Sequence, residues 1–310
     1  MLTVATVLRE TLQATLQFTA WYLEQGADQV VIVFDDVDDP AIPLLTGHPN
    51  VDCIRATDEF LESVGMTRDR RFVRRQNKSV HKVYHGLSDG WLFNVDGDEF
   101  LYLEGRTLKQ ELAAMPDNVR GVTFLPAEHL NTPDAGGQTH FRVMMNRDQV
   151  KQIYGDGAPY FRRRKGLTGH NEGKTATRAG FSGAHVRQHY LHLDDGTVLA
   201  DRVLGPPDGA YLLHFVDQGY DAWRARLPWR LSARGYCASL SNKLREVVES
   251  GDDNALDEIY GLMHVFDAAR LKELQALGLS FTLDLQLDGL ARKHFPDAYR
   301  GSEGPASHVA

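Results

Sequence analysis

The fold is decided by one stretch of sequence, Ser88-Asp-Gly-Trp-Leu-Phe-Asn-Val-Asp-Gly-Asp-Glu-Phe-Leu101. Its apolar run, residues 91–95, predicts a buried strand that stops at two aspartates separated by Gly97. Side chains at positions i and i+2 share one face of an extended backbone, so Asp96 and Asp98 point the same way. Two adjacent carboxylates repel each other unless a cation or proton shares their site. A hard divalent ion completed by waters and substrate phosphates fits this position, which favours nucleoside-diphosphate chemistry.

The same acidic stretch has a second interpretation. An Asp-Gly pair between two strands is a strong signal for a β-hairpin turn. Asp96-Gly97-Asp98 would then be a solvated turn, and the sequence alone leaves both interpretations open.

The first half of the chain alternates between strand and helix patterns. Apolar runs at residues 2–8, 29–34 and 51–56 predict strands, and spaced apolar residues at 12–23 and 80–87 predict helices. This order predicts an α/β fold, a doubly wound and mostly parallel sheet flanked by helices. Ligands bind such sheets beyond the carboxyl ends of the strands. Two acidic pairs, Asp35/Asp36 and Asp96/Asp98, each follow a predicted strand and are therefore expected at that edge.

The rest of the chain is less regular. Thr107 is expected to cap a short helix, and residues 121–126 to form a strand. We expect residues 127–177 to be loops that contact substrate or form a lid. Two further strands, at 183–193 and 210–215, lead into a helical segment that runs to about residue 293. The predicted organisation is a catalytic domain over 1–216, a helical extension over 217–300, and a disordered tail over 301–310.

Composition narrows the possible classes of protein. The chain has 310 residues, 42% of them hydrophobic, and a formal net charge of −8, which is typical of a soluble globular protein. The acidic balance argues against nucleic acid as a partner, because phosphate backbones favour clustered Lys and Arg. No apolar run reaches the roughly 20 residues of a transmembrane helix. No basic segment precedes the first apolar run, so no signal peptide is predicted and the expected location is cytoplasmic.

The stretch Trp91-Leu-Phe-Asn-Val-Asp-Gly-Asp-Glu-Phe100 resembles the W-x-x-x-x-D-x-D-E-F motif of family 2-like nucleotide-sugar glycosyltransferases. Further resemblances follow in the order of that family: residues 21–28, the Asp35-Asp36-Val37-Asp38 turn, the 174–178 and 183–185 elements, and the 212–215 and 220–226 elements. The likeness spans about residues 4–226 and does not cover the helical tail. The chain departs from the family at Arg9-Glu10, where the family has K-N-E.

The resemblance implies a GT-A type, Rossmann-like fold and an enzyme that moves a sugar from a nucleoside-diphosphate sugar to a hydroxyl of a carbohydrate or other acceptor. It implies a Mn2+ or Mg2+ cofactor with Asp96, Asp98 and His214 as ligands, Asp98 being essential to catalysis. A bound cation of this kind stabilises the diphosphate leaving group. It also implies these contacts to the nucleotide-sugar: Leu8, Glu10, Asp35, Asp36, Gln76, Asp96, Gly97, Lys174 and Arg178.

Ordinary structural roles compete with several of these assignments. Asp35 and Asp36 could cap a turn, and Gln76 could be a capping or solvated side chain. Lys174 and Arg178 could lie on a surface strand, and His214 or His185 could be hydrogen-bonded at strand ends. The basic run at 162–165 is interpreted as a solvated face, and His189 and His192 as surface or packing residues.

An inverting transferase also needs a general base near the acceptor hydroxyl. Glu128 and Asp134 lie in the irregular segment where such a carboxylate is expected. The sequence does not choose between them, and it leaves retention or inversion of configuration, donor and acceptor open.

Two other classes of protein remain as alternatives. A nucleotide- or carbohydrate-binding protein could keep this fold without turnover, and a metal-dependent phosphohydrolase also uses aspartates after a strand. The first strand ends in Val7-Leu8-Arg9-Glu10 rather than in a D-x-D-x-T motif, which disfavours the hydrolase. The chain carries no G-x-G-x-x-G segment after its first strand, which argues against a dinucleotide-dependent dehydrogenase.

Overall fold

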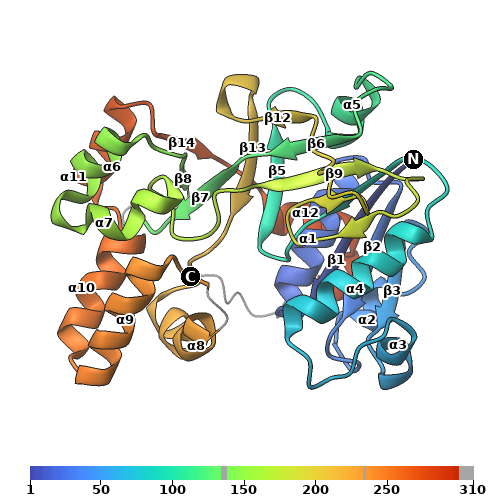
Figure 1. Ribbon diagram of the computed structural model, residues 1–310, viewed down its shortest axis with the longest axis horizontal. Coiled ribbons are helices and arrows are strands. Elements are labelled where there is room, and N and C mark those ends of the chain that lie inside the picture. The colour runs from blue at the N-terminus through green and yellow to red at the C-terminus, as the bar shows by residue number, and fades with distance from the viewer. Residues whose placement is uncertain (134–137, 233–234, 300–310) are drawn as a thin grey trace. The chain divides into compact units, whose positions relative to one another are not determined.

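The computed structural model describes residues 1–133, 138–232 and 235–299, and it forms two compact units (Figure 1). The first unit comprises residues 1–125, 172–212 and 286–299, and the second comprises the described parts of 126–171 and 213–285. The units therefore alternate along the chain. The expected domains, 1–216 and 217–300, stay a prediction, and the expected disordered tail lies outside the described residues.

The first unit is built on a seven-stranded sheet, which confirms the α/β class. Its order is β12-β6-β9-β4-β1-β2-β3, with β4, β1, β2 and β3 parallel to one another and β9 antiparallel to both of its neighbours. The strands are β1 (Leu2–Leu8), β2 (Gln29–Phe34), β3 (Val51–Arg55), β4 (Trp91–Asn94), β6 (Gly121–Phe124), β9 (Lys174–Arg178) and β12 (Arg202–Leu204).

Helices cover both faces of this sheet. On one face α1 (Leu12–Glu24) places Tyr22 against Phe93 of β4, with ring centroids 6.2 Å apart. On the other face α4 (Phe72–His85) buries Val80 and Tyr84 in a cluster with Ala5 and Leu92. The unit also contains α2 (Ile42–Leu45), α3 (Asp58–Ser63), α5 (Leu108–Ala113), α12 (Leu287–His294), β5 (Glu99–Leu103), β10 (His185–Val186), β11 (Leu191–His192), η3 (Pro206–Asp208) and η4 (Pro296–Tyr299).

Local sequence signals account for the ends of these helices. Thr11 accepts a hydrogen bond from the Ala14 amide at the start of α1, and Gly26 follows its end with φ +82°. Only glycine adopts that backbone conformation without strain. Thr107 begins α5 with a reciprocal capping box to Gln110, which confirms the expected cap.

The Asp96-Gly97-Asp98 turn is not a hairpin. β4 pairs with β1 and β9 of the seven-stranded sheet, whereas β5 lies next to the start of β13 (Ala210–His214). The turn therefore carries the chain out of the parallel sheet at the carboxyl end of β4. Of the two interpretations of the acidic stretch, the structure excludes the hairpin.

The second unit contains an antiparallel sheet in which β7 (Pro126–Leu130), β8 (Thr139–Arg142) and β14 (Ser280–Leu283) are neighbours, and β13 ends beside β7. Phe141 of β8 stacks on Phe281 of β14, with ring centroids 5.5 Å apart. The helical elements are α6 (Arg147–Tyr154), η1 (Gly155–Gly157), α7 (Ala158–Phe161), η2 (Arg162–Arg164), α8 (Tyr220–Ser232), α9 (Ala238–Ser250), α10 (Asp253–His264) and α11 (Ala268–Ala276).

Two expectations were wrong in this part of the chain. Residues 127–177 were expected to be loops, but they contain strands and helices, including β8 and α6. The segment after residue 217 was expected to be helical throughout, but it includes the strand β14. Among the described residues, no helix combines the length and the apolar character that crossing a bilayer requires.

Candidate functional site

Asp96 is held from two sides at the carboxyl end of β4. Its Oδ1 accepts a hydrogen bond from Nε2 of Gln76 at 2.6 Å, and its Oδ2 accepts one from Nζ of Lys174 at 2.7 Å. Gln76 comes from the first turns of α4 and Lys174 from the first residue of β9. The structure thus brings three of the predicted nucleotide-site residues together, although they are far apart in sequence.

A buried positive charge lies beneath this turn. The Lys174 side chain is wholly buried, and its Nζ also lies 3.4 Å from Oε2 of Glu99 and donates to the Gln188 carbonyl. Burial lowers the pKa of Lys174, but the carboxylates of Asp96 and Glu99 outweigh burial and raise the pKa above its usual value. Glu99 in turn accepts the Asp96 backbone N–H at 2.9 Å. The two carboxylates therefore share one ammonium group.

Gly97 lets the end of β1 approach the acidic turn. A Cβ atom at this position would lie 2.4 Å from Cδ2 of Leu8 and 3.1 Å from Cγ of Glu10. Real Cβ atoms do not make such short contacts, so any side chain here would displace its neighbours. Leu8 and Glu10, both predicted nucleotide contacts, thus lie against the turn, although Arg9-Glu10 departs from the family pattern.

Asp35, the first residue after β2, is paired with a cation that the sequence analysis missed. One terminal nitrogen of Arg75 lies 2.7 and 2.9 Å from the two carboxylate oxygens, and both side chains are almost fully buried. Arg75 also donates to the carbonyls of Arg68 and Arg70. The basic run at residues 68–75, which leads into α4, could have indicated a cation close to the acidic residues that follow β2.

Asp36 lies in a different environment from its neighbour. It is exposed, and its Oδ1 accepts the backbone N–H of Asp38 at 3.0 Å. This is the turn-capping arrangement in which aspartate is often found. The contact favours the turn-capping role of Asp36 that competed with nucleotide binding, and we leave Asp36 out of the proposed site.

The structure does not bring Arg178 to the acidic turn. β9 runs antiparallel to β4, so Arg178 pairs with Trp91 at the start of β4, and Lys174 lies at the other end of β9. Four residues of strand separate them by roughly 13 Å. Arg178 donates to the carbonyls of Val119 and Met115 and stacks over the Trp91 ring at 4.5 Å. These contacts hold Arg178 at the end of β9 that lies farther from the acidic turn, and we leave Arg178 out of the proposed site.

Asn94 is a further buried polar residue near the acidic turn. It precedes Asp96 by two positions, and its side chain is 4% exposed. Neither of its amide atoms has a hydrogen-bond partner among the described residues. An unpaired buried amide costs free energy, so such a group is a candidate to contact a ligand. The sequence analysis did not single it out, because an asparagine inside an apolar run has no distinctive spacing.

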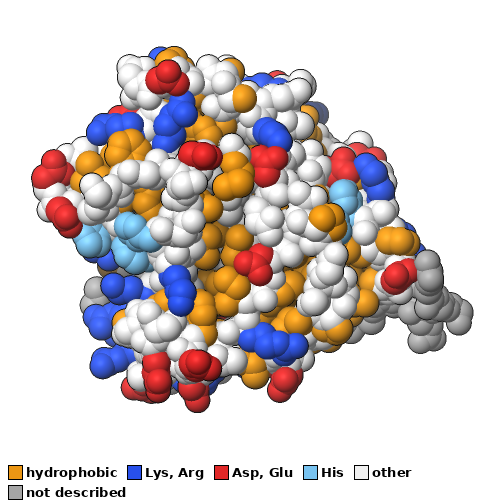
Figure 2. Space-filling model, turned by 90° about the vertical axis from the view of Figure 1, so that its right-hand side faces the viewer, with side chains coloured by type: hydrophobic (Ala, Val, Ile, Leu, Met, Phe, Trp, Pro, Cys, Tyr) orange, Lys and Arg blue, Asp and Glu red, His pale blue; other side chains and the backbone are white. Residues whose placement is uncertain are grey.

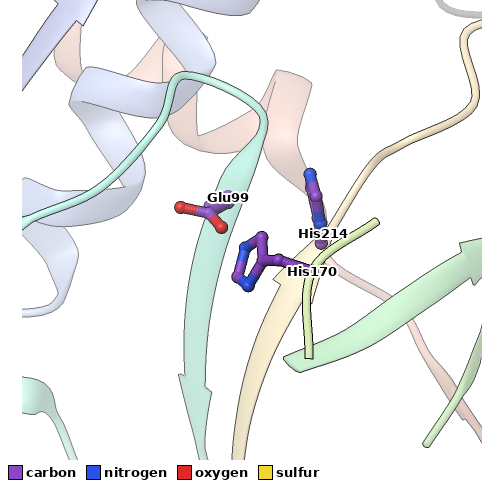
Figure 3. A group of neighbouring side chains, drawn as sticks. All are labelled: Glu99, His170 and His214. Carbon is purple, nitrogen blue, oxygen red and sulfur yellow. The ribbon is translucent and has the colours of Figure 1, made fainter. Parts of the chain in front are cut away.

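In the second unit, His214 is the last residue of β13. Its ring lies near that of His170, with centroids 5.1 Å apart. Figure 3 draws both histidines, and imidazole nitrogens are ligands that Mn2+ and borderline divalent metals accept. His170 was not predicted. It lies in the glycine-rich segment 166–173, where no spacing of ligand residues marked it.

Glu128, a predicted general base, is wholly buried in β7. Its carboxylate accepts hydrogen bonds from Arg142 at 2.7 Å, from the Thr168 amide at 2.8 Å and from the Gly169 amide. Burial raises the pKa of Glu128, but the Arg142 and His214 charges outweigh burial and the pKa is lowered. A carboxylate occupied in this way favours a structural role over proton abstraction. The other predicted base, Asp134, lies outside the described residues.

The first unit thus presents carboxylates, a buried lysine and the unpaired side-chain amide of Asn94 at the carboxyl edge of a parallel sheet. Carboxylates and imidazoles are suitable ligands for Mn2+, and oxygen ligands suit Mg2+. This edge is also where open α/β sheets bind their ligands. Compared with the known protein families and with curated proteins, the chain matches none.

Proposed function

We propose that the protein is a metal-dependent glycosyltransferase of GT-A type that uses a nucleoside-diphosphate sugar. The observation that carries the proposal is the acidic turn at the carboxyl end of β4, where Gln76 and Lys174 hold Asp96. A turn that merely closed two strands would not need a wholly buried lysine beneath it. The resemblance of residues 91–100 to the family motif gives independent support.

The chemistry of the donor side chains fits a hard divalent cation. Carboxylate oxygens such as those of Asp96 are the ligands that hard divalent cations prefer, and a carboxylate oxygen can accept more than one contact. Asp98 follows on the same turn, and we assign it as the principal carboxylate ligand. The resemblance implies His214 as a third ligand, and the ring of His170 lies beside that of His214 in the second unit (Figure 3).

The bound Mn2+ or Mg2+ would supply positive charge for the leaving diphosphate, in place of a proton. Lys174 fixes the orientation of Asp96, because its charge stays in place beneath the turn. Asp35 is oriented by Arg75 and is assigned to the ribose or base of the nucleotide. We carry neither Glu128 nor Arg178 into the proposal, because their polar groups are taken up by internal contacts.

Turnover is the test of this function. The full chain is incubated with UDP-, GDP-, CDP- and TDP-sugars, with Mn2+, with Mg2+ or with a chelator, and the released nucleoside diphosphate and free phosphate are quantified. We expect metal-dependent release of one nucleoside diphosphate. Binding of a nucleotide without release would support a binding protein, and release of free phosphate would support a phosphohydrolase.

A further inference from the structure

Four histidines of the first unit lie together away from the acidic turn. His81 and His85 are one helical turn apart on α4, with ring centroids 4.2 Å apart. His185 and His192 face each other across the β10–β11 pair, with centroids 5.2 Å apart. The rings of His81 and His185 are stacked at 5.9 Å, so they join the two pairs. The His81 cluster, as we call these four residues, therefore combines one helix face and one short hairpin.

The fold packs the helix and the hairpin that carry these rings against each other. Val80 and Tyr84 of α4 are buried in one core cluster with Ala184, Val186 and Leu191 of the hairpin. The histidines lie on the outer side of this contact and are partly or fully exposed. On the side of the molecule that Figure 2 faces, histidine side chains lie together beside Lys and Arg side chains. Because all four rings are partly or fully exposed, a solvent ion can reach the His81 cluster.

Hydrogen bonds fix which ring nitrogen donates in three of these histidines. Nε2 of His85 lies 3.0 Å from the Ala184 carbonyl, and Nε2 of His185 lies 2.7 Å from Oδ1 of Asp194. Nδ1 of His192 lies 3.1 Å from the Leu193 carbonyl. An oxygen of this kind can only accept, so each of these nitrogens donates and the other ring nitrogen of a neutral imidazole keeps its lone pair. Metal-ligating histidines are usually held by such outer contacts.

We propose that the His81 cluster is a binding site for a borderline divalent ion of the Zn2+, Ni2+ and Cu2+ class, with His81 and His85 as the primary ligands and His185 as the third. Two histidines at i and i+4 on a helix face form a recognised zinc-binding arrangement. Imidazole selects this class of metal over Mg2+ or Ca2+. The site is distinct from the acidic turn and does not depend on the proposed glycosyl transfer.

Two features of the surroundings bear on affinity. As the side chains stand, no three of these histidines place ligand nitrogens within 4.8 Å of one another among the described residues, so rotation about χ1 and χ2 must bring the third ligand in. The positive charges of Lys78 and Arg187 act on His81 and work against the binding of a cation there.

The test is calorimetric titration of the full chain with Ni2+ and with Zn2+ in the presence of excess Mg2+. We expect a site that becomes at least tenfold weaker in His81→Ala and in His85→Ala and that persists in Asp98→Ala. Asp194→Asn should weaken it by roughly tenfold, the usual cost of removing an outer contact of a histidine ligand. His48→Ala, which changes a histidine outside the cluster, should bind as the wild type does.

His85 is exposed, so its replacement is expected to leave the fold intact, and the melting temperature of each metal-free variant is measured alongside. Equal affinity and stoichiometry in the wild type and in both His81→Ala and His85→Ala would overturn the proposal. The same holds if the wild type binds neither ion. In either case the four histidines would pack against one another without binding a metal ion.

Discussion

Each of the two units contains a carboxylate paired with a wholly buried cation, yet the two carboxylates differ in their access to solvent. Lys174 lies 2.7 Å from Asp96, and Arg142 lies 2.7 Å from Glu128. The side chain of Asp96 is 23% exposed, whereas that of Glu128 is 0% exposed. The same chemistry is therefore open to a ligand in one pair and closed in the other.

Position along the strand explains the difference. Glu128 lies within β7, where neighbouring strands and the amides of residues 168 and 169 surround its oxygens. Asp96 lies beyond the last residue of β4, where sheet pairing stops. A charged pair inside a strand can only stabilise or specify the fold, whereas a pair at the carboxyl end of a parallel strand can also face a substrate. Four predictions test this comparison.

Arg142→Met should have the largest effect on stability. It removes the main cation beside Glu128 and leaves a wholly buried carboxylate, and breaking such a pair costs about 3–5 kcal/mol. Urea unfolding of the full chain measures the loss. The control is Arg224→Met in the same unit, which breaks an exposed pair with Asp253 and should change stability little. Equal stabilities of the two variants would show that the closed pair is not structural.

Asp98→Ala should abolish most activity and leave the fold intact. Loss of a group that stabilises charge in the transition state lowers kcat by about 10²–10³-fold. The rate of nucleoside-diphosphate release measures the effect, and the melting temperature of the metal-free protein monitors the fold. Asp36→Ala replaces an exposed carboxylate that caps a turn and serves as the control. Undiminished release in Asp98→Ala would remove the metal from the mechanism.

Gly97→Ala should destabilise the protein less than Arg142→Met does and should reduce activity less than Asp98→Ala does. It should, however, weaken both stability and nucleotide binding. The new Cβ would overlap Cδ2 of buried Leu8, and overpacking of this kind costs about 1–3 kcal/mol. The matched control is Gly261→Ala in α10, where a Cβ meets no atom within 4 Å and alanine favours the helix by about 1 kcal/mol. A Gly97→Ala protein as stable as the wild type would contradict the close approach of Leu8.

The smallest expected effect is a difference between the two pairs in how their contributions to stability depend on pH. The folded-state pKa of Glu128 is lowered, so its contribution is present above its unfolded pKa of about 4.3 and is lost as the pH falls through the folded value. The folded-state pKa of Lys174 is raised, so its contribution is present below its unfolded pKa of about 10.4 and is lost as the pH rises through the folded value.

Melting temperatures of the wild type, Glu128→Gln and Lys174→Met across pH measure these contributions. The difference between wild type and Glu128→Gln should shrink in acid, and that between wild type and Lys174→Met should shrink in alkali. The reverse pattern would mean that the charges are assigned wrongly.

The sequence predicted the parallel half of the first unit because its signals are local. β1, β2 and α4 are marked by apolar runs or by helical spacing over several residues, and α1 has Thr11 and Gly26 at its ends. Such local signals are absent from two elements of the second unit. β8 carries the buried Arg142 in a four-residue strand, and α6 has only Val150 and Tyr154 buried, so neither shows an apolar pattern.

The sequence predicted several residues of the candidate site, but it did not predict all of the contacts that they make. Asp96, Gln76 and Lys174 were named from the sequence, and the structure brings them together. The pairing of Asp35 with Arg75 was not foreseen, because it joins residues 40 positions apart. The separation of Lys174 from Arg178 was not foreseen either, because it depends on β9 running antiparallel to β4. Contacts of this kind follow from topology, which single-sequence patterns do not encode.

Metal-dependent nucleotide binding at the acidic turn is the central claim, and one thermal-shift panel tests it most directly. UDP, GDP, CDP and TDP are each added with and without Mn2+ to the wild type, Asp98→Ala and Asp36→Ala. A ligand at 100 times its dissociation constant adds about 2.7 kcal/mol of stability, which is readily detected as a raised melting temperature. We predict that one nucleotide stabilises the wild type and Asp36→Ala only with Mn2+ and does not stabilise Asp98→Ala. No shift with any nucleotide, or an equal shift in Asp98→Ala, would contradict the claim.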